Sequence, residues 1–202
     1  MEFARVVRRR RMVRRFEDRP VPQAVLDRIL ETALHAPSAG FAQGLELVVL
    51  EGAESVREYA RITDPWRRKP LGDNPPPVIV LPLSHKAAYL ARYERPDKEG
   101  LGMHDERAWP VPYWDLDAAM AAMLMLLAAV DEGMGAWFFG IFHGEGELLT
   151  WLGVPEGLRP IGAIALGYPA ADDRVSGSAA TIPRRSLHDV VHRGRWGARA
   201  RA

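Results

Sequence analysis

The sequence contains no cysteine among its 202 residues. Without cysteine the chain cannot form a disulfide bond, act through a thiolate, or hold an iron–sulfur cluster or a cysteine zinc site. No secretory signal is visible, and the most apolar run, residues 118–130, falls short of the roughly 18 to 20 residues that a membrane span needs. We therefore expect a cytoplasmic protein that does not enter a membrane.

The net charge is also small, at +1, since 27 Lys and Arg residues are balanced by 26 Asp and Glu residues. The arginines are unevenly placed, and those near the N-terminus stand at positions 5, 8, 9, 10, 11, 14, 15 and 19. A transit peptide would need a cleavable spacer, and a nucleic-acid surface would need interleaved aromatic residues. We favour a compact site for an anion such as a phosphate, held by guanidinium forks and loop amides, and expect no nucleic-acid partner.

Composition indicates one soluble domain over residues 1–202, because 48% of the residues are hydrophobic and 26% are charged. Within it, residues 84–113 are polar, aromatic and irregular, a pattern typical of a lid or of a partly disordered loop. Everything after Pro169, residues 170–202, is interpreted as an arm.

Hydrophobic periodicity predicts helices and strands along the rest of the chain. The clearest helix is amphipathic, has Pro22 in its first turn, and carries Leu26, Ile29 and Ala33 on one apolar stripe. The predicted helices span residues 3–10, 22–36, 53–62 and 145–152, and the predicted strands span residues 45–50, 77–83, 136–142 and 161–168.

The stretch that dominates the sequence is a helix predicted over residues 115–131. Between its first turn and its last residue it is entirely apolar, so it has no polar face to place in water. We expect Asp115 or Asp117 to cap its start, and Gly133 and Gly135 to end it. A chain of this size has little other structure to surround such a helix, which predicts burial between the two subunits of a homodimer.

Several short motifs follow one another in a specific order. Residues 10–16 (RRMVRRF) precede a helix, the small-residue loop 36–43 (APSAGFAQ) and an apolar strand. Later motifs are GMGAWFFGIF at 133–142, LGVP at 152–155, GYP at 167–169 and RRSL at 184–187. In this order, over nearly the whole chain, they resemble the nitroreductase family of FMN-dependent oxidoreductases.

The resemblance implies an α+β fold. This is a nitroreductase-like α/β sandwich with a mainly antiparallel central sheet flanked by helices, a long buried helix at the dimer interface and a C-terminal arm around the partner subunit. It also implies FMN as cofactor and NAD(P)H as reductant, with ping-pong hydride transfer to a planar acceptor such as a nitroaromatic or a quinone. No general acid or nucleophile is needed, since the flavin carries the chemistry.

The resemblance further assigns cofactor positions, residue by residue. The positions that match contacts to the FMN phosphate and ribityl chain are Arg10, Arg11, Met12, Arg14, Arg184 and Arg185. The positions that match contacts to the isoalloxazine ring are Pro37, Ser38 and Ala39 from the other subunit, and Phe139, Gly140 and Ile141, whose backbone faces the N5 and O4 edge. A dianionic phosphate agrees with the arginine cluster inferred from charge alone.

Two positions depart from the family pattern. Met12 stands where a serine is usual, and Phe41 stands where an asparagine is usual, ahead of the cofactor position Gln43. Neither side chain can make the polar contact expected there. Phe41, Trp109 and Tyr113 are candidates to contact the acceptor, and core or interface packing is the other interpretation of the last two. The departures also motivate a second hypothesis, a non-catalytic protein that binds or sequesters FMN or a deazaflavin.

Overall fold

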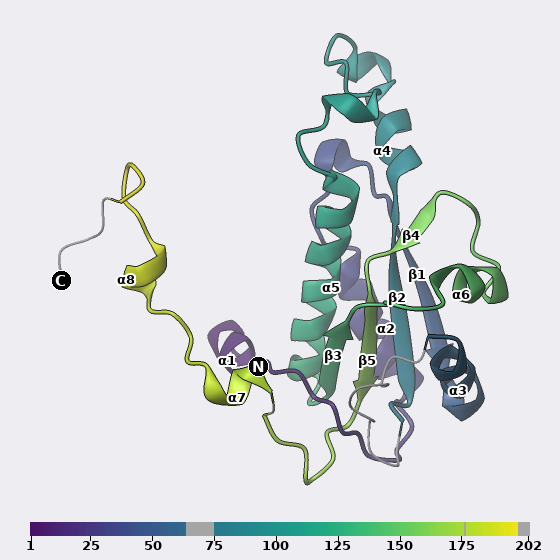
Figure 1. Cartoon of the computed structure of the whole chain (residues 1–202), viewed down its shortest axis with the longest axis vertical. Coiled ribbons are helices and arrows are strands. Elements are labelled where there is room, and N and C mark those ends of the chain that lie inside the picture. The colour runs from purple at the N-terminus through teal and green to yellow at the C-terminus, as the bar shows by residue number, and fades with distance from the viewer. Residues whose placement is uncertain (64–74, 176, 198–202) are drawn as a thin grey trace.

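The computed structural model describes residues 1–63, 75–175 and 177–197. In these residues a five-stranded sheet forms the centre of the molecule (Figure 1). Its strands are β1 (Leu45–Glu51), β2 (Val78–His85), β3 (Gly135–Phe139), β4 (Leu158–Pro160) and β5 (Ala163–Gly167). They lie in the order β1-β2-β5-β3, and β4 pairs with β2. All of these strand pairs are antiparallel.

Helices cover both faces of this sheet. On one face α2 (Gln23–Ala33) and α5 (Tyr113–Asp131) pack on a cluster that includes Val78 and Val80 of β2. On the other face α3 (Gly52–Thr63) and α6 (Glu145–Trp151) pack on a second cluster that includes Ile79 and Leu81. Alternate residues of a strand point to opposite faces, so β2 contributes side chains to both clusters. This explains why its sequence is a continuous apolar run. The α+β sandwich with a mainly antiparallel sheet is confirmed.

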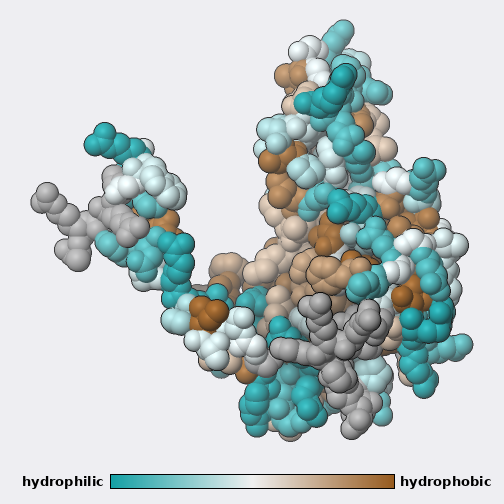
Figure 2. Space-filling view, viewed as in Figure 1, coloured by the Kyte–Doolittle hydropathy of each residue, from teal (hydrophilic) through white to brown (hydrophobic). Residues whose placement is uncertain are grey.

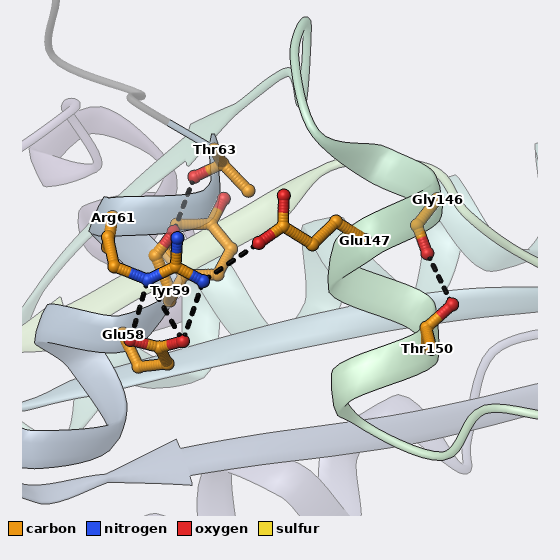
Figure 3. A network of polar contacts seen from close by, with 7 residues as sticks. All are labelled: Glu58, Tyr59, Arg61, Thr63, Gly146, Glu147 and Thr150. Carbon is orange, nitrogen blue, oxygen red and sulfur yellow. Dashed lines mark hydrogen bonds and ion pairs between the residues drawn. The ribbon is translucent and has the colours of Figure 1, made fainter.

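The packing of α3 on α6 illustrates how the second layer is held (Figure 3). Arg61 of α3 bridges Glu58 at 2.9 Å and Glu147 of α6 at 2.8 Å, but all three side chains are at least one third exposed. Exposed ion pairs contribute little to stability. Burial of Tyr59 and Leu148, both fully inaccessible, is therefore the larger stabilising term.

The predicted elements are present, with shifted ends. The predicted strand 136–142 stops at Phe139, so residues 140–142 lie in a loop. The stretch 84–113, predicted to be irregular, begins with the end of β2 and contains α4 (Lys86–Tyr93) and 3₁₀ turns at Pro96–Lys98 and Glu106–Ala108. This excursion projects beyond one end of α5 (Figure 1).

Helix α5 buries only one of its faces in the single chain. Its inner face packs on the sheet and α2, whereas Leu116, Met120 and Met123 on the outer face remain 45%, 40% and 41% exposed. With 19 residues, α5 has the length and composition of a membrane span, but its packing against the sheet makes it a core helix.

The predicted ends of α5 need correction. Neither Asp115 nor Asp117 caps the helix, because both lie inside it and direct their carboxylates to other segments, to Ser84 and to Ala39. Gly133 does end the helix, at φ 74°. Gly135 instead begins β3.

Helix α1 and the described part of the arm lie outside the sandwich. Helix α1 (Phe3–Arg9) contacts α5, and the arm carries α7 (Ser178–Thr181) and α8 (Leu187–Val190) away from the body (Figure 1). Apolar side chains on the arm are exposed, with Ile182 at 67% and Leu187 at 71%. The arm stands clear of the body in the space-filling view (Figure 2).

Candidate functional site

The basic segment, residues 10–15, lies along the edge strand of the sheet. Met12 forms a parallel bridge with Ala136, and the Val13 N–H donates to the Ala136 carbonyl at 2.9 Å. Val13 is buried against Gly135, where a Cβ would lie only 2.7 Å from the Val13 side chain. Backbone pairing and burial therefore fix the arginines of this segment beside β3.

A buried aspartate, Asp173, holds the basic segment from the arm side. Its carboxylate accepts hydrogen bonds from the backbone N–H groups of Arg14 and Arg15 at 3.0 and 2.9 Å, and it forms an ion pair with Arg11. These three donors offset the cost of burying a carboxylate that is only 5% exposed. Arg11, predicted as a phosphate contact, is used in this internal ion pair.

Arg14 instead lies beside a row of aromatic rings on β3. Its Cζ is 5.3 Å from the centroid of the Trp137 ring, and Trp137 stacks on Phe139 with centroids 4.5 Å apart. Residues 137 and 139 share a face because side chains alternate along a strand. A guanidinium next to stacked rings suits a ligand with a flat part and an anionic part.

The small-residue loop lies at the other end of α5. The Ala39 N–H donates to Oδ2 of Asp117 at 2.8 Å, and Nε of Arg92 donates to the Gly40 carbonyl at 2.7 Å. Gly40 also lies so close to Tyr93 that a Cβ there would come within 2.8 Å of the ring. The loop is thus supported from beneath by α5 and by α4.

The backbone of this loop is strained. Gly40, Phe41 and Gln43 have φ values of 61°, 55° and 52°, a region that non-glycine residues rarely adopt. Ser38 stabilises the bend, since its Oγ accepts a hydrogen bond from the Gln43 N–H at 3.1 Å. Strain that persists because surrounding contacts hold it is typical of ligand sites.

Phe41 is exposed on this loop, with 71% of its surface accessible. One side of the loop lines a cavity of about 190 Å³ with Pro37, Ser38 and Asp117 among its walls. A cavity of about 150 Å³ accommodates a benzene ring, so this one is the size of a single aromatic ring. Phe41 therefore lies at the mouth of a space suited to a flat group, and it offers that space no polar contact.

The two other acceptor candidates lie in the excursion. Trp109 is 8% exposed, donates its Nε1–H to the Met103 carbonyl at 2.7 Å, and packs against Tyr89 and Trp114. Its burial supports the core interpretation, and its contact with an acceptor stays a prediction. Tyr113 is 36% exposed and lies against Trp109, with ring centroids 5.5 Å apart.

The C-terminal arginines are not brought to the basic segment within the chain. Arg184 and Arg185 are exposed on the arm between α7 and α8, and Arg185 donates to the Asp189 carbonyl. In the view of Figure 1 this part of the arm runs away from the sheet. Their predicted contact with the phosphate stays a prediction.

The single chain also separates the two halves of the predicted site. The small-residue loop is tied to Asp117, whereas the basic segment pairs with the start of β3, next to the end of α5 at Asp131. Positions 117 and 131 are about 21 Å apart along the helix at 1.5 Å of rise per residue. The prediction that the loop serves the site of the other subunit is compatible with this separation.

Fold and site together define an α+β sandwich in which an arginine-lined sheet edge and a strained small-residue loop lie at opposite ends of one apolar helix. The sequence model of the Nitroreductase family matches residues 7–168. The chain belongs to the Nitroreductase family, as its motifs predicted.

Individual relatives agree with this membership. A protein of Archaeoglobus fulgidus, provisionally named an NADH dehydrogenase/NAD(P)H nitroreductase, is 26% identical over 96% of this chain and 99% of its own. The FMN reductase [NAD(P)H] of Bacillus subtilis is 24% identical over 79% of this chain and 63% of its own.

Solved structures share the fold. A nitroreductase family protein of Clostridium difficile has a TM-score of 0.71 and 20% identity, covering 96% of this chain and 99% of its own. A protein of Desulfovibrio desulfuricans, provisionally identified as a nitroreductase and solved in complex with FMN, has a TM-score of 0.68 and 24% identity, covering 95% of both chains.

Two aspartates at the site were not predicted there. Asp117 was one of two residues expected to cap α5, the other being Asp115, although a charge at the border of an entirely apolar run is a signal for a buried polar contact. Asp173 follows Asp172 in the arm, and nothing in the sequence distinguishes the buried residue from its exposed neighbour.

Replacing Asp173 by alanine should destabilise the protein. The change leaves two backbone N–H groups and the Arg11 guanidinium without their acceptor, which should lower the free energy of unfolding by about 2 to 4 kcal/mol. Asp172→Ala is the matched control, because Asp172 is exposed and pairs with exposed Arg15, so it should cost less than about 1 kcal/mol. Urea unfolding measures both, and equal effects would contradict the anchoring role of Asp173.

Proposed function

We propose that the protein is an FMN-dependent oxidoreductase that takes reducing equivalents from NAD(P)H and passes them to a planar acceptor such as a nitroaromatic or a quinone. The observation that carries the proposal is the placement of Arg14 beside the stacked rings of Trp137 and Phe139, on a chain of this family. Relatives named for FMN and NAD(P)H support it.

The residues present fit FMN in their chemistry. A phosphate requires cationic donors, which Arg10 and Arg14 supply beside β3, and a flat ring system requires apolar planar surfaces and backbone groups that can approach closely. When bound, FMN would supply the hydride chemistry of a ping-pong cycle between NAD(P)H and the acceptor.

The protein's own part is to bind, orient and shield the cofactor. Arg10 and Arg14 hold the phosphate end, with Arg184 and Arg185 of the arm as further cationic donors. The backbone at Phe139, Gly140 and Ile141 would hold the ring edge, and Pro37, Ser38 and Ala39 of the small-residue loop would cover a ring face. Met12 is half-buried against the core, so it packs and offers no hydrogen bond.

We further propose that the working unit is a homodimer in which α5 packs on the α5 of a second copy. The exposed stripe of Leu116, Met120 and Met123 follows helical spacing and offers the apolar surface for this contact. If the two-fold axis is perpendicular to α5, the paired helices are antiparallel, and the small-residue loop of one chain then meets the basic segment of the other. This geometry joins the two separated halves of the site.

The proposal is tested with apo-protein, FMN and reductant. Titration with FMN should quench flavin fluorescence to saturation, and anaerobic NADH or NADPH should then bleach the flavin absorbance until a quinone restores it. Arg14→Ala should weaken FMN binding about 10- to 100-fold, since a charge-assisted hydrogen bond is lost. Arg15→Ala removes the same charge from an exposed pair and should change little.

The results also separate the two hypotheses for function. FMN binding without bleaching by either reductant would favour a protein that binds or sequesters the flavin. Absence of binding to FMN and to a deazaflavin would contradict both.

Phe41→Asn should tighten FMN binding and widen the range of acceptors. Asparagine restores a polar contact, tolerates a positive φ, and removes a ring from the mouth of the cavity. Phe3→Asn is the control, because Phe3 is an equally exposed phenylalanine on α1, outside the predicted site. FMN titration and the rate ratio of a small quinone to a bulky nitroaromatic are measured for both variants. Unchanged affinity and an unchanged ratio in Phe41→Asn would show that Phe41 only packs.

A further inference from the structure

Asp117 is an anomaly within the most apolar helix of the protein. It is 5% exposed and its Oδ2 accepts two hydrogen bonds, from the Ala39 N–H at 2.8 Å and from the Tyr89 hydroxyl at 2.9 Å. Burying a carboxylate is costly, and apolar residues of similar size would pack without that cost. A role at the loop explains why the charge is placed there.

The partner Tyr89 is held as a donor. Its ring is 1% exposed, and burial raises the pKa of its hydroxyl, as do the hydrogen bond to Asp117 and the charge of that carboxylate. The hydroxyl therefore stays protonated and keeps donating to Oδ2. Tyr89 also fills the space under Gly44, where a Cβ would lie 2.5 Å from its ring. The Tyr89–Asp117 pair thus forms a rigid support directly below the loop.

The supported loop is the strained one. Ala39 is the first residue of the short turn in which Gly40 and Phe41 have positive φ. Asp117 accepts a hydrogen bond from the N–H of Ala39. Strained conformations persist only when surrounding contacts over-determine them.

We propose that Asp117 is a positioning residue that fixes the small-residue loop, through the Ala39 amide, in the conformation that receives the planar cofactor. The inference rests on the proposed function, because it takes the ligand of the loop to be FMN. Asp117 acts through the loop backbone and need not touch the flavin. The hydrogen bond from the Ala39 amide to the Asp117 carboxylate, which we call the loop anchor, does not depend on any ligand.

Two readouts test the proposal. In apo-protein, hydrogen exchange of the peptide covering residues 36–44 reports the loop, whose amides at Ala39, Phe41, Ala42 and Gln43 are all hydrogen-bonded. Fluorescence titration with FMN reports the affinity. Asp117→Ala should accelerate exchange and weaken FMN binding, each by about tenfold or more, as expected from loss of a hydrogen bond to a charged group.

Two further variants make the result specific. Asp117→Asn keeps a carbonyl oxygen in place and should restore both readouts to within about threefold of the wild type. Asp115→Ala removes the same charge from the same helix, but Asp115 contacts Ser84 and Arg159 and not the loop, so both readouts should stay unchanged. If Asp117→Ala does not fold, Asp117→Ser replaces it, because a serine hydroxyl is too short to reach Ala39.

Each outcome decides the question. Faster loop exchange with weaker FMN binding, both rescued by Asp117→Asn, supports the proposal. If hydrogen exchange of the loop is unchanged in Asp117→Ala, Asp117 does not anchor the loop. If exchange is faster but FMN affinity is unchanged, the anchored loop does not serve the cofactor. An Asp117→Asn variant as impaired as Asp117→Ala would assign the effect to charge and overturn positioning. Failure of the wild type to bind FMN would refute the proposed function and the link to FMN. Hydrogen exchange of the loop would still show whether Asp117 holds it in place.

Discussion

One sheet cannot cover a helix that is apolar on all sides, and this constraint organises the molecule. The inner face of α5 forms the larger core with α2 and the sheet, whereas Leu116, Met120 and Met123 remain 40% to 45% exposed. Exposed apolar surface of this kind is a signature of association. A second copy of the chain covers it in the account proposed above, and the same contact completes the site.

Two buried carboxylates fix the two halves of that site. Asp173 holds the basic segment by two backbone amides and Arg11, and Asp117 holds the small-residue loop by the Ala39 amide. In both places a polar group in an apolar setting is offset by several donors.

The sequence predicted the layers well, because periodicity and apolar runs report burial directly. The helix at 115–131, the strand at 77–83 and the family motifs were all readable in this way. The ends were less predictable: β3 stops at Phe139 although the apolar pattern continues, since pairing with β5 ends there. Contacts between distant segments leave no local signal in the sequence, so the ion pair of Arg11 with Asp173 was not predicted.

The central claim is that the cofactor site is shared between two chains, and mixed dimers test it most directly. One chain carries Arg14→Ala and the other carries Asp117→Ala, each with its own affinity tag for purification of the mixed species. In a shared site the undamaged loop of the first chain meets the undamaged arginines of the second. The account predicts that the mixed dimer regains one tight FMN site that both parent proteins lack. A mixed dimer as weak as its parents, or chains that sediment only as monomers, would contradict it.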